Sequence, residues 1–300
     1  MAYNIDLHMH STYSDDGEFT PTELVQQCNA IGVRIMSITD HNSARANAEA
    51  RAAAEKFGIQ YISGIEIDCR FANTDIHLLG YDIDETSQDF AELETYLFTE
   101  EQTASVERLA LTRALGFEVS EAELNALSNL EDGTGLWNGE LFGEVLLSKP
   151  EYCDHELLKP YRPGGARDDN PFVNFYWDFY AQGKPCYVEM ALPTLQTAVA
   201  LIHKNGGKSV LAHPGNNLKG RFELFDDIAT AGVDGVEVFC SYHNEQTAKY
   251  FYKQAQKHGL IITCGSDYHG KVKPAVKLGG SGCWVDPHSM AGQLTFSIME

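Results

Sequence analysis

The sequence has few positive charges. Its 22 Lys and Arg residues stand against 43 Asp and Glu residues, which gives a formal net charge of −21. A surface of this sign repels polyanions, so long nucleic acid and an anionic membrane are poor partners for the protein as a whole. A small phosphorylated substrate stays compatible with the charge, because bound divalent cations reverse the potential of a site locally.

The sequence also lacks paired cysteines and long hydrophobic runs. Its seven cysteines are an odd number and include no C-x-x-C pair, so neither a disulfide framework nor a thiolate zinc site is indicated. No run of about eighteen apolar residues occurs, and the N-terminus lacks the basic and apolar regions of a signal peptide. We expect a cytoplasmic protein with reduced cysteines and no membrane partner.

Short apolar runs alternate with helix-like stretches along most of the chain. Its 300 residues, 43% of them hydrophobic, are enough to bury a large core. The alternation is typical of βα units around a parallel sheet, and about eight such runs favour closure into a barrel. The expected strands are residues 4–8, 35–39, 61–67, 76–81, 186–190, 208–212, 235–240 and 261–265. The expected helices between them are residues 21–31, 44–57, 194–205, 224–231 and 244–258, each followed by a glycine suited to a C-cap.

One interval breaks this alternation. The runs at 76–81 and 186–190 are much further apart than the roughly 30 residues of a βαβ unit. Residues 92–115 and 121–130 within the interval have helical composition, so an inserted helical unit is indicated. We therefore predict a barrel domain of residues 1–97 and 184–300, and an inserted helical cap domain of residues 98–183.

Side chains of the types that bind metals stand near the ends of the predicted strands, except His77, which lies on a strand. The carboxyl ends of barrel strands meet on one face, and an H-x-H pair on a strand points both imidazoles to the same side. A single histidine of this kind is more often a core residue, but so many together favour a metal centre. Imidazole with carboxylate suits Zn, Mn or Fe. The residues are His8, His10, Asp40, His41, Glu66, His77, His213, Asp267 and His269, with Asp15 and Asp16 in the first loop.

The motifs around these residues resemble those of the PHP (polymerase and histidinol phosphatase) family. The resemblance covers about 1–95 and 185–300 and implies an α/β fold, a distorted (β/α)7 TIM-like barrel that holds two or three divalent metal ions. The matching segments are D-L-H-M-H-S-T-Y-S-D at 6–15, I-T-D-H at 38–41, G-I-E at 64–66, I-H-L-L-G-Y at 76–81, A-H-P at 212–214 and G-S-D-Y-H at 265–269.

The resemblance also implies a role for each ligand. The first ion would take His8, His10, Glu66 and Asp267. The second would share Glu66 and add His77 and His213. The third would take Asp15, His41 and His269, with Asp16 as a competing ligand. A hydroxide held between two ions through Glu66 would attack phosphorus, and Asp40 would orient an imidazole from behind.

Substrate contacts are expected from the insertion. The segment R-P-G-G-A-R-D-D-N-P-F-V-N-F-Y-W at 162–177 resembles the closing part of the insertion in family members that act on small phosphorylated nucleotides. Arg162 and Arg167 flank its Gly-Gly turn and are predicted to bind phosphate, with ion pairs to nearby acids as the alternative. Tyr176 and Trp177 suit stacking on a base, but core packing is the commoner use of such residues.

Three further residues belong to the same face of the barrel. His243 follows the seventh predicted strand and is a candidate for substrate contact or proton donation, with a solvated loop histidine as the alternative. Lys271 and Lys273 follow the D-Y-H motif and are interpreted as surface lysines, with anion binding as the alternative.

The predicted function is metal-dependent hydrolysis of a phosphomonoester of a small nucleotide, similar to a 3',5'-bisphosphonucleoside. Three alternatives use the same residues: 5'-3' exonuclease action on short RNA or DNA, histidinol phosphate hydrolysis, and a non-catalytic metal-binding domain. The acidic charge disfavours the first, the long insertion disfavours the second, and the complete ligand set disfavours the third.

Overall fold

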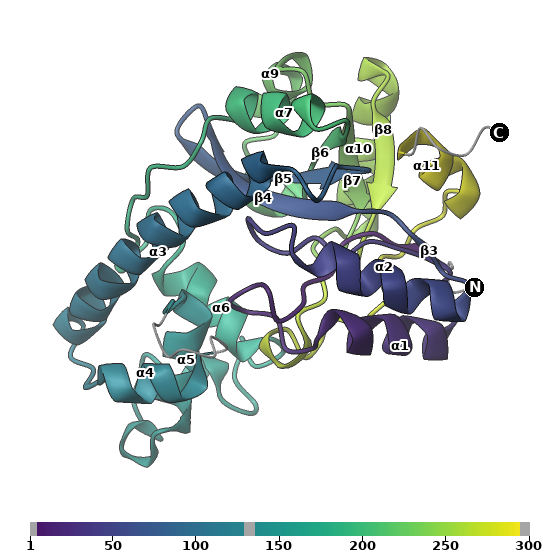
Figure 1. The fold of residues 1–300 in the computed structure, drawn as a ribbon. Coiled ribbons are helices and arrows are strands. Elements are labelled where there is room, and N and C mark those ends of the chain that lie inside the picture. The colour runs from purple at the N-terminus through teal and green to yellow at the C-terminus, as the bar shows by residue number, and fades with distance from the viewer. Residues whose placement is uncertain (1–4, 129–135, 295–300) are drawn as a thin grey trace.

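A computed structural model describes residues 5–128 and 136–294, and its strands form two sheets (Figure 1). The smaller sheet is parallel and has the order β1 (Ile5–Asp6), β2 (Ile35–Met36), β3 (Gln60–Tyr61). The larger sheet has the order β4 (Gly64–Phe71), β5 (Thr74–Tyr81), β6 (Lys208–Leu211), β7 (Gly235–Phe239), β8 (Ile261–Cys264). The predicted α/β class is confirmed.

The larger sheet is mixed, which corrects the expectation of a parallel sheet. β4 and β5 form an antiparallel hairpin, β5 pairs antiparallel with β6, and the remaining pairs are parallel. The hairpin turns at Ala72 and Asn73, both with positive φ, as a two-residue turn of a hairpin requires. The apolar run at 61–67 is divided between β3 and β4, which lie in different sheets.

Single bridges join the two sheets where the predicted ligands begin. Leu7 N donates to Cys264 O at 3.1 Å, which ties the end of β1 to β8. Parallel bridges also pair Met9 with Tyr268, and His41 with Glu66. These contacts bring the carboxyl ends of β1, β2 and β8 close to the start of β4.

The expected strand at 186–190 is not present. Cys186 packs in a hydrophobic cluster of helices, and its N–H donates to Phe179 O at 2.7 Å. Pairing with β4 is limited to a bridge between Arg70 and Thr194 that follows Pro193. The apolar composition of this segment, which suggested a strand, therefore reflects burial of Cys186 among helices.

Helices flank the sheets nearly where the sequence predicts them. They are α1 (Pro21–Ile31), α2 (Ala46–Phe57), α7 (Leu195–Lys204), α9 (Leu224–Thr230) and α10 (Glu245–His258), with the short α8 (Pro214–Asn217), η3 (Gly270–Val272) and α11 (Pro287–Leu294). A capping box between Thr20 and Glu23 starts α1, and Gly32 ends it in the left-handed conformation.

The residues between β5 and α7 form mostly helices. They are α3 (Gln88–Ala114), α4 (Glu121–Leu127), α5 (Gly139–Ser148), η1 (Pro150–Tyr152), η2 (Lys159–Tyr161) and α6 (Pro171–Phe179). The predicted helices at 92–115 and 121–130 correspond to α3 and α4, although residues 129–130 lie outside the described ranges. We call residues 98–183 the helical segment.

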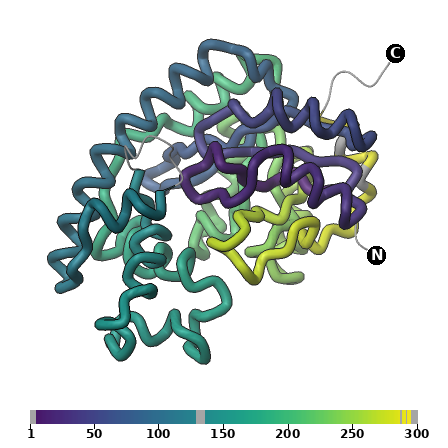
Figure 2. The backbone as a smooth tube through the Cα atoms, turned by 60° about the horizontal axis from the view of Figure 1, so that its bottom comes forward, coloured from purple at the N-terminus to yellow at the C-terminus, as the bar shows by residue number. Residues whose placement is uncertain are grey.

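The helical segment has its own hydrophobic cluster. Phe142, Phe175 and Tyr180 are buried within it, away from the two clusters that pack on the sheets. The long helix α3 connects the cores, because Phe90 packs with the sheet residues and Leu109 with the helical ones. Figures 1 and 2 both show the segment to one side of the sheets, beside the loops that follow β1 and β8.

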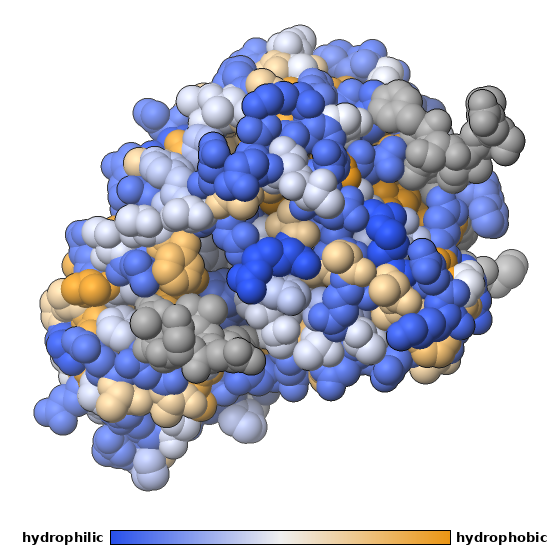
Figure 3. All heavy atoms as spheres, viewed as in Figure 1, coloured by the Kyte–Doolittle hydropathy of each residue, from blue (hydrophilic) through white to orange (hydrophobic). Residues whose placement is uncertain are grey.

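The surface seen in Figure 3 is largely hydrophilic, in keeping with the acidic composition. No helix in the described ranges is both long enough and apolar enough to cross a membrane.

Candidate metal centre

The first group of side chains is fully buried at the joint between the sheets. Nε2 of His8 and Nε2 of His10 each lie 3.1–3.3 Å from both Glu66 Oε2 and Asp267 Oδ1. The two Nε2 atoms are only 3.1 Å apart. Nitrogen and carboxylate atoms this close together match the ligand spacing around one ion with bonds of about 2.0–2.2 Å. This is the set predicted for the first ion.

The second group lies around the other oxygen of Glu66. His77 Nδ1 and His213 Nε2 are 3.0 and 3.1 Å from Glu66 Oε1, as expected for the second ion. His41 Nδ1 also faces Glu66, at 3.4 Å from Oε2. Asp68 extends the group, because its Oδ1 is 3.4 Å from His77 Nε2 and 3.5 Å from His41 Nδ1.

The third group contains Asp16 in the place predicted for Asp15. Asp16 Oδ2 is 3.1 Å from His269 Nε2 and 4.0 Å from His41 Nε2, and the ring of His10 stacks on that of His269. Among the described residues, no ion pair joins Asp15 to these imidazoles. The first loop turns at Ser14–Gly17, and Asp15 also lines the cavity, but within the described ranges only Asp16 of the two aspartates forms ion pairs with the histidines.

A second layer of residues fixes the imidazoles. Glu237 Oε1 lies 3.0 Å from His8 Nδ1, and Asn217 Oδ1 lies 2.7 Å from His213 Nδ1. Such partners set the tautomer, leaving the other ring nitrogen to face the ligand position. The role expected for Asp40 is indirect: the hydroxyl of Ser14 donates to Asp40 at 3.1 Å and lies 3.1 Å from His10 Nδ1.

The donor atoms of these groups fit divalent cations. Four of the buried polar atoms without a hydrogen-bond partner belong to the second and third groups, namely Asp16 Oδ1, His41 Nδ1, Asp68 Oδ1 and His269 Nε2. Buried polar atoms are normally satisfied, so a concentration of exceptions indicates a missing ligand. Three sets of residues each offer ligand atoms that lie within 4.8 Å of one another inside the set. They are His8/His10/Glu66/Asp267, His10/Asp16/His41/His269 and His41/Glu66/His77.

Protonation states of the metal-free protein reflect the same crowding. Burial alone would lower the pKa of His8, but the carboxylates of Glu66, Glu237 and Asp267 raise it well above its usual value. Burial would likewise raise the pKa of Glu66, and the surrounding histidines instead hold it well below its usual range. Burial has the larger effect at His269, whose pKa is lowered to about 4.

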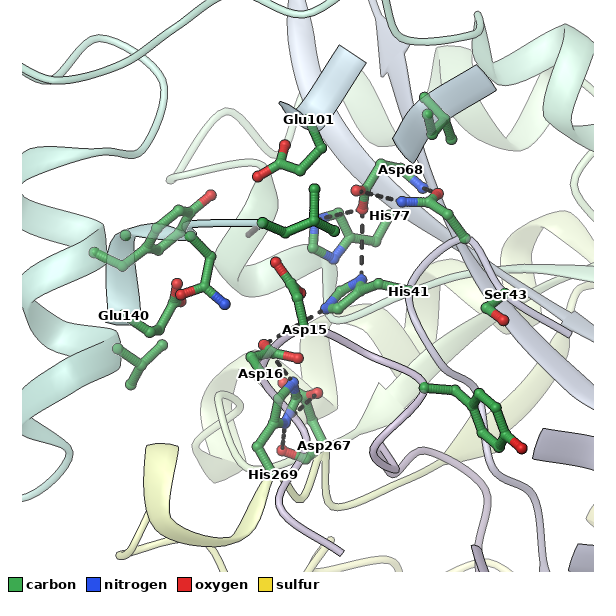
Figure 4. Close-up of a pocket in the computed structure, with 18 of the residues that line it drawn as sticks. Asp15, Asp16, His41, Ser43, Asp68, His77, Glu101, Glu140, Asp267 and His269 are labelled. Atoms are coloured by element: carbon green, nitrogen blue, oxygen red, sulfur yellow. Dashed lines mark hydrogen bonds and ion pairs between the residues drawn. The ribbon is translucent and has the colours of Figure 1, made fainter. Parts of the chain in front are cut away.

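A cavity of about 230 Å³ opens above the three groups. His41, His77, His213 and Asp267 form part of its floor, and Glu101, Arg108, Glu140 and Trp177 of the helical segment form the opposite wall. Figure 4 shows Glu101 and Glu140 facing the cluster of Asp16, His41 and Asp267. Burial and the nearby Asp16 raise the pKa of Glu140 to about 8.

The two arginines predicted to contact substrate lie elsewhere. Arg162 donates to the backbone oxygens of Leu147 and Tyr152 at 3.1 and 3.0 Å. Arg167 forms a two-point ion pair with Asp178 at 3.0 and 3.1 Å, which is the alternative weighed above. Neither lines the cavity. Arg108 does, and it is 92% buried, with its guanidinium paired to Glu101.

His243 and Lys273 also differ from expectation. Both ring nitrogens of His243 are used, since Nδ1 lies 2.8 Å from Val238 O and Nε2 accepts from Gly215 N at 2.9 Å. It does not line the cavity. Lys273 is buried rather than exposed, and its Nζ lies 2.6 Å from Asp267 Oδ2. Lys271 is partly exposed and pairs with Glu144.

The sequence contained some signal for the residues that were missed. Asp68 follows Glu66 by two positions on β4, which places both on the same face of the strand. Glu237 has no such neighbour, and which face of β7 it lies on depends on the register of that strand with β8, which the sequence does not give. Arg108 and Glu140 come from helices whose orientation the spacing of residues does not define.

Comparison with known proteins supports the same assignment. The PHP domain matches residues 6–149. The chain is 31% identical over 271 residues to a 3',5'-nucleoside bisphosphate phosphatase of Chromobacterium violaceum, covering 89% of this chain and 87% of that protein. It is 29% identical over 273 residues to a 5'-3' exoribonuclease of Haemophilus influenzae, covering 90% and 91%.

A solved structure shares the whole fold. It is described as an amidohydrolase from Chromobacterium violaceum with bound sulfate and no metal, and it matches with a TM-score of 0.76 at 26% identity over 97% of each chain. The motifs that resemble the PHP family thus meet at one cavity, in a chain aligned to phosphoester hydrolases over most of its length. The chain belongs to the PHP-domain family and is a phosphoesterase.

Proposed function

We propose that the protein hydrolyses a phosphomonoester of a small nucleotide, with two or three divalent ions (Mn, Fe or Zn) held by the three groups. The observation that carries this proposal is the position of the ligand atoms at the floor of a small cavity whose opposite wall is the helical segment. A ligand that reaches the floor must be compact. The acidic surface around it disfavours a long polyanion.

The ligands of the proposed centre differ from the predicted set at two positions. His8, His10, Glu66, His77, His213, Asp267, His41 and His269 keep their predicted roles, Asp16 replaces Asp15, and Asp68 is added. Divalent ions bound there would lower the pKa of water and neutralise phosphoryl oxygens.

The chain supplies the other contacts. Asp40 and Glu237 hold the imidazoles in place from behind, through Ser14 and directly. Trp177 Nε1 and Asn216 Nδ2 belong to residues that line the cavity and are buried donors with no hydrogen-bond partner among the described residues, so they suit acceptor atoms of a substrate. The guanidinium of Arg108 adds further N–H donors to the lining, with its charge balanced by Glu101.

We further propose that the two sheets act as one distorted barrel formed by residues 1–97 and 184–300, which has seven strands when β3 and β4, which follow one another directly, are counted as one. The bridges between β1 and β8 and between β2 and β4 support this closure. Residues 98–183 would then be a cap, a view supported by their separate hydrophobic cluster and by their contribution to the cavity wall.

The substrate is proposed to be similar to a 3',5'-bisphosphonucleoside, as the name of the Chromobacterium violaceum relative suggests. The test is phosphate release from nucleoside bisphosphates, mononucleotides, short oligonucleotides and histidinol phosphate, using protein reconstituted with manganese, iron or zinc. Selective turnover of a bisphosphate is expected. His10→Ala should abolish it, while His203→Ala, which changes an exposed histidine paired with Asp234, should not.

A second candidate is 5'-3' exonuclease action on short RNA, suggested by the Haemophilus influenzae relative. It uses the same residues and predicts turnover confined to oligonucleotides. Absence of turnover on every substrate with each metal, in protein shown to contain metal, would contradict both enzymatic proposals.

A further inference from the structure

Lys273 is a buried lysine in the wall of the cavity. It is only 5% exposed, and it follows η3 in the loop beyond the D-Y-H motif. Its ammonium lies 2.6 Å from Asp267 Oδ2 and 5.1 Å from the centre of the Tyr242 ring. Lys271, two positions earlier, has a side chain that is 39% exposed and pairs with Glu144 on α5. Burial of a lysine ammonium needs a compensating anion, which Asp267 supplies in the metal-free protein.

The carboxylate of Asp267 serves two cationic positions at once. Its Oδ1 is directed at His8 and His10 in the first group, at 3.3 and 3.2 Å, while Oδ2 accepts from Lys273. A divalent ion in that group would be balanced by the two carboxylates facing it, Glu66 and Asp267. Lys273 would then keep its positive charge with no carboxylate of its own, in a place where an unpaired charge is costly.

Nearby acids do not supply that balance. Asp16 and Glu140 also act electrostatically on Lys273, but among the described residues neither forms an ion pair with it, and Asp16 is directed at His269 in the third group. Lysine has three N–H donors, and Asp267 and the Tyr242 hydroxyl are partners of the Lys273 ammonium, so a donor remains for another partner in the cavity. An oxyanion on the cavity floor satisfies both needs, because it brings negative charge and several acceptor oxygens.

We propose that Lys273 binds a non-bridging oxygen of the phosphoryl group that is hydrolysed, and also of the phosphate that is released. This inference rests on the proposed phosphoesterase function and adds a substrate-contacting residue to it. Lys273 acts as a fixed positive charge, next to the metal ligands but not one of them. The ligand it recognises is a tetrahedral oxyanion, whatever alcohol the phosphoryl group is attached to.

The competing explanation is that Lys273 only positions Asp267. The two explanations differ in what is lost when the ammonium is removed. If Lys273 only positions Asp267, its removal lowers the metal content, and phosphate affinity falls because metal is lost. A residue that binds the oxyanion affects phosphate affinity while the metal content stays constant.

The experiment compares Lys273→Met, Lys273→Gln and Lys273→Arg with the matched control Lys271→Met, all reconstituted with manganese. Metal content is measured by elemental analysis, and binding of inorganic phosphate by calorimetry. We expect Lys273→Met and Lys273→Gln to keep the wild-type metal content and to bind phosphate about 10- to 100-fold more weakly, because one charged hydrogen bond is lost. Lys273→Arg should restore part of the affinity, and Lys271→Met should match wild type.

Kinetics on the best phosphomonoester give a second measurement. Loss of the ammonium should lower kcat/KM by about 100-fold, as for removal of one donor to a transition-state oxyanion. Wild-type phosphate affinity in metal-replete Lys273→Met would overturn the proposal, and so would loss of metal in both neutral variants. A wild-type enzyme inactive on every substrate would refute the proposed function instead, and phosphate calorimetry would still test Lys273.

Discussion

Glu66 shows how single residues build the metal centre. Its Oε2 faces His8 and His10, and its Oε1 faces His77 and His213, so one side chain joins the first two groups. The glycine two positions earlier makes this possible. A Cβ at Gly64 would lie 2.2 Å from Ser37 Oγ and 2.8 Å from Ile38 O, so only glycine lets β4 approach the end of β2 this closely.

Asp15 and Asp16 offer a matched pair of substitutions in adjacent residues. Asp16→Asn should weaken metal binding in the third group by about 10-fold or more, because its carboxylate faces His269, while Asp15→Asn should leave it unchanged. Metal content after reconstitution and dialysis measures the difference. Loss of metal in Asp15→Asn but not in Asp16→Asn would show that Asp15 is the ligand, as the sequence predicted.

Glu140 makes stability depend on pH. Its pKa is raised to about 8 by burial and by Asp16, from an ordinary value of 4.5. The folded state therefore keeps a proton that the unfolded state has released, so stability falls as pH rises from about 4.5 to 8. In chelator, Glu140→Gln should be more stable than wild type at pH 8 by a few kcal/mol, at about 1.4 kcal/mol per pKa unit, and similar to it near pH 4.5.

Glu144→Gln is the control, since Glu144 lies on the same helix and pairs with Lys271. Denaturant unfolding at several pH values measures the free energy. If the difference in free energy of unfolding between Glu140→Gln and wild type does not change with pH, Glu140 is already ionised in the folded protein.

At the scale of secondary structure, the ends of α5 and η1 depend on an arginine. Arg162 joins Leu147 O at the end of α5 to Tyr152 O in η1, and this use of the guanidinium replaces the predicted contact with phosphate. Arg162→Ala should lower the free energy of unfolding by about 1–2 kcal/mol and leave KM unchanged.

Arg113→Ala provides the comparison, because Arg113 donates in the same way to Val119 O beyond the end of α3. The two variants should behave alike in denaturant and in kinetics. An increase in KM that is specific to Arg162→Ala, without loss of stability, would return Arg162 to the substrate site.

At the scale of the whole molecule, metal binding should stabilise the fold. The ligands come from residues near both sheets, so ions would link parts of the chain that single bridges join. A ligand at a thousand times its Kd adds about 4 kcal/mol of stability. Removing metal with a chelator should therefore lower Tm by roughly 5–10 °C, and adding manganese back should restore it.

Scanning calorimetry with elemental analysis of the same samples tests this prediction. An unchanged Tm in protein proved to be metal-free would mean that the groups do not bind ions in the native state. If manganese restores Tm fully and zinc only in part, manganese is the better fit to the ligand set.

Local patterns predicted much of this protein correctly. The H-x-H motif was enough to bring His8 and His10 together, because side chains in an extended segment repeat every two residues. Asp267 and His269 also lie together, at 3.5 Å, although Asp267 has a positive φ and the D-Y-H segment is not extended. Glycines after the helices also located the helix ends, because the left-handed conformation is a property of a single residue. The family followed from these motifs taken together.

Other features depended on parts of the chain that are distant in sequence. The ion pair of Asp16 with His269, the burial of Lys273 and the partners of Arg162 follow from the path of loops and the packing of helices. The sequence by itself determined which residue types end the strands, because strand and turn geometry are local. Only the tertiary structure decided which charges share the cavity, because a side chain's direction in a loop, and the atoms around it, are set by contacts across the fold.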